Sequence, residues 1–143
     1  GGLVSRYYIK NLGGSDKVDK LMMIGTPNHG IYGWLIGGLC DTAHSGQECQ
    51  DMQYDSSFIT NLNSQDETYG DVQYITIAGN CEPNENDFDD EVVRGSSVRL
   101  EGATNLVVEG SCITLSSDTF HSALLRYNYA PEVYNHIVNF LKN

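Results

Sequence analysis

The first hydrophobic pattern along the chain is that of an amphipathic helix over residues 3–12. Apolar side chains recur there every four residues, which places them on one helical face and predicts that this face is buried. Gly13-Gly14 supplies a C-terminal stop, because glycine tolerates the left-handed conformation that ends many helices. The apolar positions are Val4, Tyr8 and Leu12, with Leu3 and Tyr7 beside them, and both tyrosines are expected in the core.

A second helical pattern covers residues 132–142 near the end of the chain. Pro131 precedes it, which suits the first position of a helix or the position before it. His136 lies on this helix and is expected to be a surface or packing residue. The apolar face consists of Val133, Ile137, Phe140 and Leu141.

Three further segments are typical of β-strands. Residues 20–25 form a short apolar run that predicts a strand buried on both faces. Residues 72–79 and 104–109 are rich in β-branched side chains, and the first of these alternates in the manner of a strand. Strands separated by long connections favour a parallel sheet flanked by helices. The whole chain, residues 1–143, is therefore expected to be a single α/β unit.

The connection over residues 31–70 has no clean hydrophobic period. A connection of this length inside a compact domain is usually functional, so we expect a lid-like insertion that covers a substrate. A short helix is predicted from Ser56 to Leu62, with Ser57 or Asp55 near its cap. The 31–70 connection also contains an apolar cluster, for which two interpretations remain open: a lid face that contacts lipid, or the ordinary packing of a loop. The cluster consists of Trp34, Leu35 and Ile36.

Charge argues against a nucleic-acid partner, and hydropathy argues against a membrane-spanning segment. The net charge of −11 disfavours binding to nucleic acid. The apolar runs are all much shorter than the roughly 20 residues of a membrane-spanning helix, so no transmembrane segment is expected.

The four cysteines favour two disulfides over a metal site. None of them has the C-x-x-C spacing of zinc or redox motifs. The short separation of Cys40 and Cys49 suits one bridge, and Cys81 and Cys112 each follow a predicted strand and suit a second. Such bridges would indicate an oxidising compartment and hence an extracellular, secreted protein.

Polar groups with chemical potential follow the predicted strands. In an open parallel sheet, ligands bind beyond the carboxyl ends of the strands. Asn28 and His29 follow the first strand, and His29 is interpreted mainly as a structural loop residue. An acidic group and then His121 follow the next two strands, in the order of the second half of a Ser…Asp…His triad. The candidate acids are Asp87, Asp89 and Asp90.

Several segments in the same order resemble α/β-hydrolase lipases and esterases of bacteria and archaea. Residues 1–14 (GGLVSRYYIKNLGG) resemble the segment that follows the nucleophile elbow, G-x-S-x-G. Residues 23–30 (MIGTPNHG) resemble the family's strand ending in G-T-P. Residues 90–93 (DEVV) resemble its acid motif, and residues 120–122 (FHS) its histidine loop. The resemblance covers essentially the whole chain and implies the C-terminal portion of an α/β-hydrolase fold.

Carried over by position, the resemblance implies that Asp90 is the triad acid and His121 the general base. Asp89 is the alternative acid. Gly1 and Gly2 would be the remnant of the elbow, so that the nucleophilic serine lies two residues upstream of Gly1 and outside this chain. The missing N-terminal half of the domain would also supply the oxyanion-hole amides. The 143-residue chain alone is therefore expected to be inactive.

The implied function is hydrolysis of carboxylic esters, with an acylglycerol or another apolar ester as substrate. This chemistry requires no cofactor or metal. Calcium is the cation that the carboxylates between Glu85 and Glu91 would suit, although they lack the spacing of a recognised calcium loop. The alternative hypothesis is a non-catalytic α/β-hydrolase-like module that binds a partner through Trp34 and its neighbours.

Overall fold

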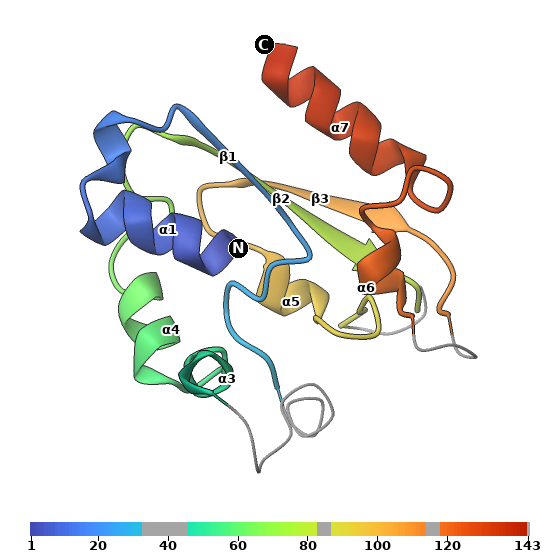
Figure 1. Cartoon of the computed structure of the whole chain (residues 1–143), viewed down its shortest axis with the longest axis horizontal. Coiled ribbons are helices and arrows are strands. Elements are labelled where there is room, and N and C mark those ends of the chain that lie inside the picture. Colours follow the sequence, from blue (N-terminus) through green and yellow to red (C-terminus); the bar gives the residue numbers. More distant parts are fainter. Residues whose placement is uncertain (33–45, 83–86, 114–117, 143) are drawn as a thin grey trace.

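A parallel β-sheet forms the centre of the molecule. The computed structural model describes residues 1–32, 46–82, 87–113 and 118–142. Within these ranges the sheet has the strand order β1-β2-β3, with β2 in the middle and both pairings parallel (Figure 1). The expectation of an α/β arrangement with a parallel sheet is thereby confirmed. The strands are β1 (Lys20–Ile24), β2 (Gln73–Asn80) and β3 (Thr104–Glu109).

Helices cover both faces of this sheet, with α6 and α7 on one side and α1 and α5 on the other, while α4 packs against α1 (Figure 1). The helices α1 and α7 lie within one residue of the ranges expected from the hydrophobic pattern. In order along the chain, the helical elements are α1 (Gly2–Asn11), the 3-10 turn η1 (Gly14–Asp16), α3 (Gln47–Asp51), α4 (Ser57–Asn63), α5 (Gly95–Val98), α6 (Phe120–Ala123) and α7 (Pro131–Lys142).

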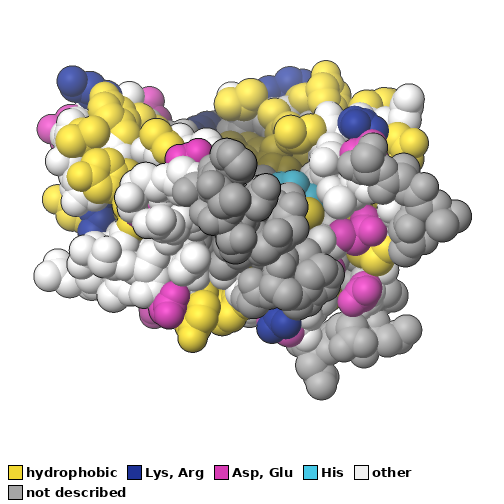
Figure 2. Space-filling model, turned by 60° about the horizontal axis from the view of Figure 1, so that its bottom comes forward, with side chains coloured by type: hydrophobic (Ala, Val, Ile, Leu, Met, Phe, Trp, Pro, Cys, Tyr) yellow, Lys and Arg dark blue, Asp and Glu magenta, His cyan; other side chains and the backbone are white. Residues whose placement is uncertain are grey.

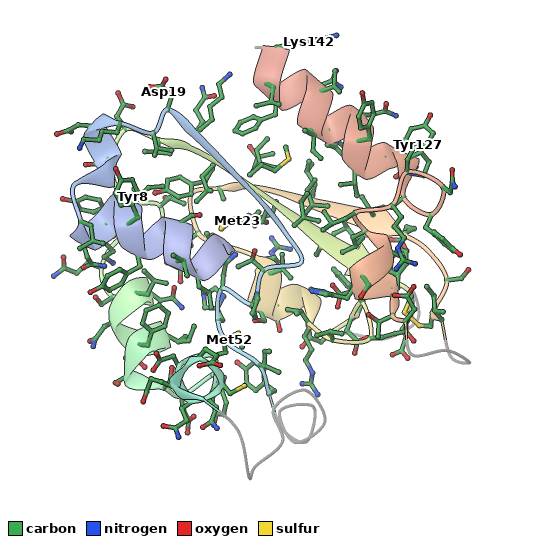
Figure 3. The ribbon with its side chains drawn as sticks, in the orientation of Figure 1. Tyr8, Asp19, Met23, Met52, Tyr127 and Lys142 are labelled. Atoms are coloured by element: carbon green, nitrogen blue, oxygen red, sulfur yellow. A yellow bond between two sulfur atoms is a disulfide. The ribbon has the colours of Figure 1, made fainter. Side chains whose placement is uncertain are left out.

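Alternating side chains of the strands enter two separate hydrophobic clusters. Met22 and Ile24 pack with Ile77 against α6 and α7, whereas Met23 packs with Ile9 of α1. Figure 3 shows Met23 in the interior, beside α1 and the sheet. Because successive side chains of a strand point to opposite faces, a strand covered on both sides reads as a continuous apolar run. This explains the uninterrupted hydrophobic stretch in β1.

The buried face of α1 differs from the expected one. Leu3, Arg6 and Ile9 are buried, while Val4 is 70% and Leu12 is 62% exposed. Tyr7 and Tyr8 are also exposed, so the expectation that they belong to the core was wrong. The physical reason is that a cation, Arg6, occupies the middle of the inward face, which hides the true three-residue spacing from a hydrophobic count.

Two local expectations are corrected at the other helices. Leu141, expected on the buried face of α7, is 71% exposed, whereas Val133 is buried. The cap of α4 is neither Ser57 nor Asp55 but Ser56, whose Oγ accepts the Ile59 N–H at 3.1 Å. Pro131 is the first residue of α7, in agreement with its suitability for a helix start.

Only part of the 31–70 connection belongs to the described residues. Its described portion contains α3 and α4, and Ile31 forms an isolated parallel bridge with Gln53. Residues 33–45 lie outside the described ranges, and with them the expected lid cluster, Trp34, Leu35 and Ile36. In the described part of the chain, every helix is too short or too polar to cross a bilayer.

A disulfide joins Cys81, just after β2, to Cys112, just after β3. The Cα atoms of the two residues are 4.9 Å apart, and this bridge is one of the two expected from the sequence. Cys49 is also disulfide-bonded, while Cys40, its expected partner, lies outside the described residues. The Cys81–Cys112 bridge fastens together the two loops in which the candidate acid and base lie.

Candidate functional site

Asp90 lies in the loop after the central strand, and its side chain is completely buried. A buried carboxylate must be hydrogen-bonded to be tolerated. Its Oδ1 accepts the backbone N–H groups of Val92 at 3.1 Å and Val93 at 2.7 Å. These bonds fix the orientation of the carboxylate and leave Oδ2 free for another partner.

That partner is His121, in the first turn of α6. Its Nδ1 lies 2.7 Å from Asp90 Oδ2, and its backbone N–H donates to the Asp90 carbonyl at 2.9 Å. The helix starts at this point because the Thr119 side chain accepts the Ser122 N–H. With Nδ1–H donated to a carboxylate, the lone pair of the ring lies on Nε2, which is the arrangement of a general base.

The other two candidate acids have different partners. Asp89 uses Oδ1 to accept the Glu91 N–H at 2.7 Å, and Asp87 accepts the N–H and hydroxyl of Ser96. Neither Asp87 nor Asp89 is seen to contact His121 within the described ranges. The geometry therefore favours Asp90 over Asp89 as the partner of the histidine.

Glu91 also belongs to the site, although the sequence indicated it only as one of the carboxylates that would suit calcium. Its Oε2 accepts the backbone N–H groups of Ile113 at 2.8 Å and Phe120 at 2.6 Å. Its backbone has φ of 72°, in the left-handed region that non-glycine residues rarely adopt. Its position beside Asp90 could not indicate these two bonds, because both of its partners lie far along the chain.

His121 lines a cavity of about 450 Å³ at the carboxyl end of β1. Gly1, Leu3 and Val4 of the first helical segment line the same cavity. Figure 2 shows a hollow in this face of the molecule, with hydrophobic side chains around it and a histidine at its edge. The remaining lining is mostly apolar, with two carboxylates, and comprises Ile24, Gly25, Thr26, Pro27, Glu48, Asp51, Met52 and Phe58.

Two glycines allow the close contacts on which this arrangement depends. A Cβ on Gly2 would lie 2.3 Å from Thr26 Oγ1, so only glycine permits α1 to approach the end of β1 this closely. A Cβ on Gly25, whose φ is 58°, would lie 2.7 Å from Cε1 and 2.8 Å from Nδ1 of His121. Gly25 therefore provides the space that the imidazole ring occupies.

We expect the substitution Gly25→Ala to displace the His121 ring and to strain the backbone. An alanine in the left-handed region costs about 1–2 kcal/mol, and the new methyl group would overlap the imidazole. The free energy of unfolding should fall by at least that amount, measured by urea denaturation. Gly13→Ala is the matched control, because Gly13 also has positive φ (72°) but no atom lies within 4 Å of its added Cβ. An equal response of the His121 NMR ring signals to both substitutions would contradict this explanation.

Asn28 and His29 do not join the Asp90–His121 pair. Asn28 is completely buried, and its Nδ2 donates to the Val98 carbonyl at 2.7 Å. The Nε2 atom of His29 lies 2.7 Å from Glu67 Oε1, beside a different cavity of about 420 Å³. These residues hold the loop after β1 in place, which agrees with the structural interpretation of His29.

Arg6 connects this loop to α1 and α4. Its guanidinium donates to both the carbonyl and the side chain of Asn28, to the Asn63 side chain at 2.8 Å and to the Glu67 carbonyl at 3.1 Å. Burial lowers the pKa of Arg6 to about 10, an effect that Glu67 partly opposes. Arg6 therefore remains a cation at neutral pH, and its hydrogen bonds to Asn28 hold the loop after β1.

The described residues contain no cluster of three or more His, Cys, Asp or Glu side chains that could hold a metal ion. The expected calcium ligands from Glu85 to Glu91 fall partly outside the described ranges. Within those ranges the oxygens of Asp87, Asp89 and Glu91 bind backbone and serine groups.

Comparison with known proteins adds no assignment. No family model matches the chain, and no curated protein sequence matches it.

Proposed function

We propose that the protein hydrolyses carboxylic esters by a Ser-His-Asp mechanism, with His121 as general base and Asp90 as the acid that orients it. The observation that carries this proposal is the 2.7 Å contact between a fully buried Asp90 and a His121 that lines a cavity. The serine of the triad would precede Gly1, as the resemblance of residues 1–14 to the segment after a lipase elbow implies.

The cavity supports this location for the serine. Gly1 and His121 line the same cavity, and the close packing of Gly2 on Thr26 holds the start of α1 there. A residue shortly before Gly1 would therefore lie within reach of the His121 ring.

The chemistry follows from the two nitrogens of His121. Nε2 accepts the proton of the serine hydroxyl while the serine oxygen attacks the ester carbonyl carbon. The same proton then passes to the departing alcohol, leaving an acyl-enzyme. Water attacks the acyl carbon, transfers a proton to Nε2, and the carboxylic acid leaves as that proton returns to the serine. Asp90 stabilises the imidazolium through Nδ1–H in both half-reactions.

The lining of the cavity supports a neutral, apolar ester such as an acylglycerol. Leu3, Ile24 and Phe58 contribute hydrocarbon surface on which an acyl chain can pack. Glu48 and Asp51 add negative charge, which disfavours anionic substrates. We extend the proposal to residues 31–70 as a lid over this cavity, and to an extracellular location that the Cys81–Cys112 disulfide supports.

Covalent labelling of the full-length protein tests this function. A fluorophosphonate, which phosphonylates activated serines and releases fluoride, should label one serine two residues before Gly1, and p-nitrophenyl esters of several chain lengths should be hydrolysed. The chain 1–143 alone serves as the control and should be neither labelled nor active. Full-length protein that neither reacts nor hydrolyses any ester would refute the proposal and leave the non-catalytic binding module. Activity of the chain 1–143 alone would refute the location of the serine.

A further inference from the structure

We propose that Glu91 is a positioning residue that holds His121 against Asp90. This inference rests on the proposed function, since it assigns a role within the same site. Glu91 does not line the cavity, and its side chain accepts two backbone N–H groups of the histidine loop, while its own N–H donates to Asp89. It therefore acts through other residues and is not itself a catalytic residue.

Two consecutive residues of the acid loop bind two consecutive residues of the histidine loop. The Asp90 carbonyl accepts the His121 N–H at 2.9 Å, and Glu91 Oε2 accepts the Phe120 N–H at 2.6 Å. The side-chain contact between Asp90 and His121 completes a third connection. The backbone carrying the imidazole is thus held at two adjacent amides, which restricts both the position and the direction of the ring.

The same Glu91 oxygen also holds the other end of the histidine loop. Oε2 accepts the Ile113 N–H at 2.8 Å in addition to the Phe120 N–H. Ile113 directly follows the disulfide residue Cys112, while Phe120 begins α6. A single carboxylate oxygen therefore fastens the chain on both sides of the segment that leads from β3 to His121. Bonds to an ionised acceptor are stronger than those between neutral groups, which suits this role.

The backbone conformation of Glu91 is consistent with a structural role for its side chain. Its φ of 72° is a conformation for which glycine is the default residue. A side chain at such a position persists only where the surroundings hold it. Here the Glu91 N–H donates to Asp89 Oδ1 at 2.7 Å, and the carboxylate makes its two backbone bonds. The strained conformation directs the carboxylate toward the histidine loop.

Removal of the Glu91 carboxylate should impair catalysis more than substrate binding. Small misplacements of a reacting group lower the rate of the chemical step, by about 100-fold for a displacement near 1 Å. In full-length protein, Glu91→Ala should lower kcat for ester hydrolysis by about 10- to 100-fold. KM should change by less than about threefold, because the cavity lining remains intact. The low-field NMR signal of the His121 Nδ1 proton should broaden or disappear.

Two further variants separate positioning from stability. Glu91→Gln keeps an oxygen acceptor and should recover part of both kcat and the Nδ1 signal. Glu91→Gly relieves the backbone strain but lacks the carboxylate, so it should behave as Glu91→Ala even if it folds more stably. Asp87→Ala is the matched control, because Asp87 lies in the same loop and its carboxylate also accepts two hydrogen bonds, both from Ser96. It should leave kcat and the Nδ1 signal unchanged.

The two readouts keep this inference distinct from the proposed function. Glu91→Ala and Glu91→Gly proteins that retain both kcat and the His121 Nδ1 signal would overturn the role of Glu91. An equal loss in Asp87→Ala would overturn it too, because the effect would then belong to the loop as a whole. If wild-type protein hydrolyses no ester, the proposed function fails, and the NMR comparison still decides whether Glu91 positions His121. If Glu91→Ala does not fold, the Glu91→Gln and Glu91→Gly variants decide.

Discussion

Asp90→Asn in the full-length protein is expected to lower kcat for ester hydrolysis by about 10⁴-fold while leaving the fold intact. An asparagine can keep its oxygen toward the Val92 and Val93 N–H groups, as Asp90 Oδ1 does. Its NH₂ group then faces Nδ1 of His121, which must become an acceptor. The ring is forced into the tautomer with the proton on Nε2, where it cannot take a proton from a serine.

Initial-rate kinetics with a neutral ester, together with NMR of the His121 ring nitrogens, would measure this effect. Asp89→Asn is the matched control, because Asp89 is the neighbouring carboxylate and its side chain accepts the Glu91 N–H. A loss confined to Asp89→Asn would make Asp89 the acid and reject Asp90. The double substitution of Asp90 and His121 should be little worse than His121→Ala alone, since residues that act as a unit give non-additive losses.

Arg6→Met should produce the largest loss of stability, about 3–5 kcal/mol in the free energy of unfolding. Methionine fills much of the same volume but donates no hydrogen bond. The side-chain oxygens of Asn28 and Asn63 lose the guanidinium donor, and Asn28 is completely buried. Unsatisfied buried acceptors each cost about 1–3 kcal/mol, which accounts for the magnitude.

Urea denaturation would provide the measurement, with Arg126→Met as the control. The Arg126 side chain is 52% exposed and pairs with Asp118 at the surface, so its loss should cost less than about 1 kcal/mol. Equal losses for the two substitutions would show that the buried hydrogen bonds of Arg6 contribute no more to the free energy of unfolding than a surface ion pair does.

The pKa of Arg6 also fixes how this effect depends on pH. Because burial lowers the pKa of Arg6 to about 10, below that of an exposed arginine, the unfolded chain carries more protons at this group than the folded chain only above about pH 10. Stability from this group therefore rises with pH above about 10 and is flat below it. The difference between wild type and Arg6→Met should be the same at pH 6 and pH 8.

The strands and the Asp90–His121 pairing could be predicted from the sequence for a simple physical reason. A strand covered on both faces is a continuous apolar run, and residues 21–24 of β1 form one. The carboxyl ends of neighbouring parallel strands meet at one edge of a sheet, so residues that follow β2 and β3 come together. Order along the chain was therefore enough to pair an acid with His121.

The choice of inward face in α1 and the role of Glu91 could not be predicted in this way. Arg6 is buried because Asn28, Asn63 and Glu67 converge on it from distant parts of the chain. Glu91 depends in the same manner on Ile113 and Phe120. Such partners follow from the tertiary fold and leave no periodic trace in the sequence, where Arg6 resembles a solvent-facing helix residue.

The parallel register of the sheet has a consequence for how the chain folds. Lys20 of β1 pairs with Gln73, whereas Ile75 of β2 pairs with Thr104, so the first pairing closes the longer loop. The difference in closure entropy is only about 0.5 kcal/mol, but neither pairing can start from a local hairpin. The rate of folding should therefore be limited by a search for distant partners, with β2 and β3 joining first. Oxidation of Cys81 and Cys112 would then trap the early β2–β3 intermediate, and β1 would add to an edge that is already in place.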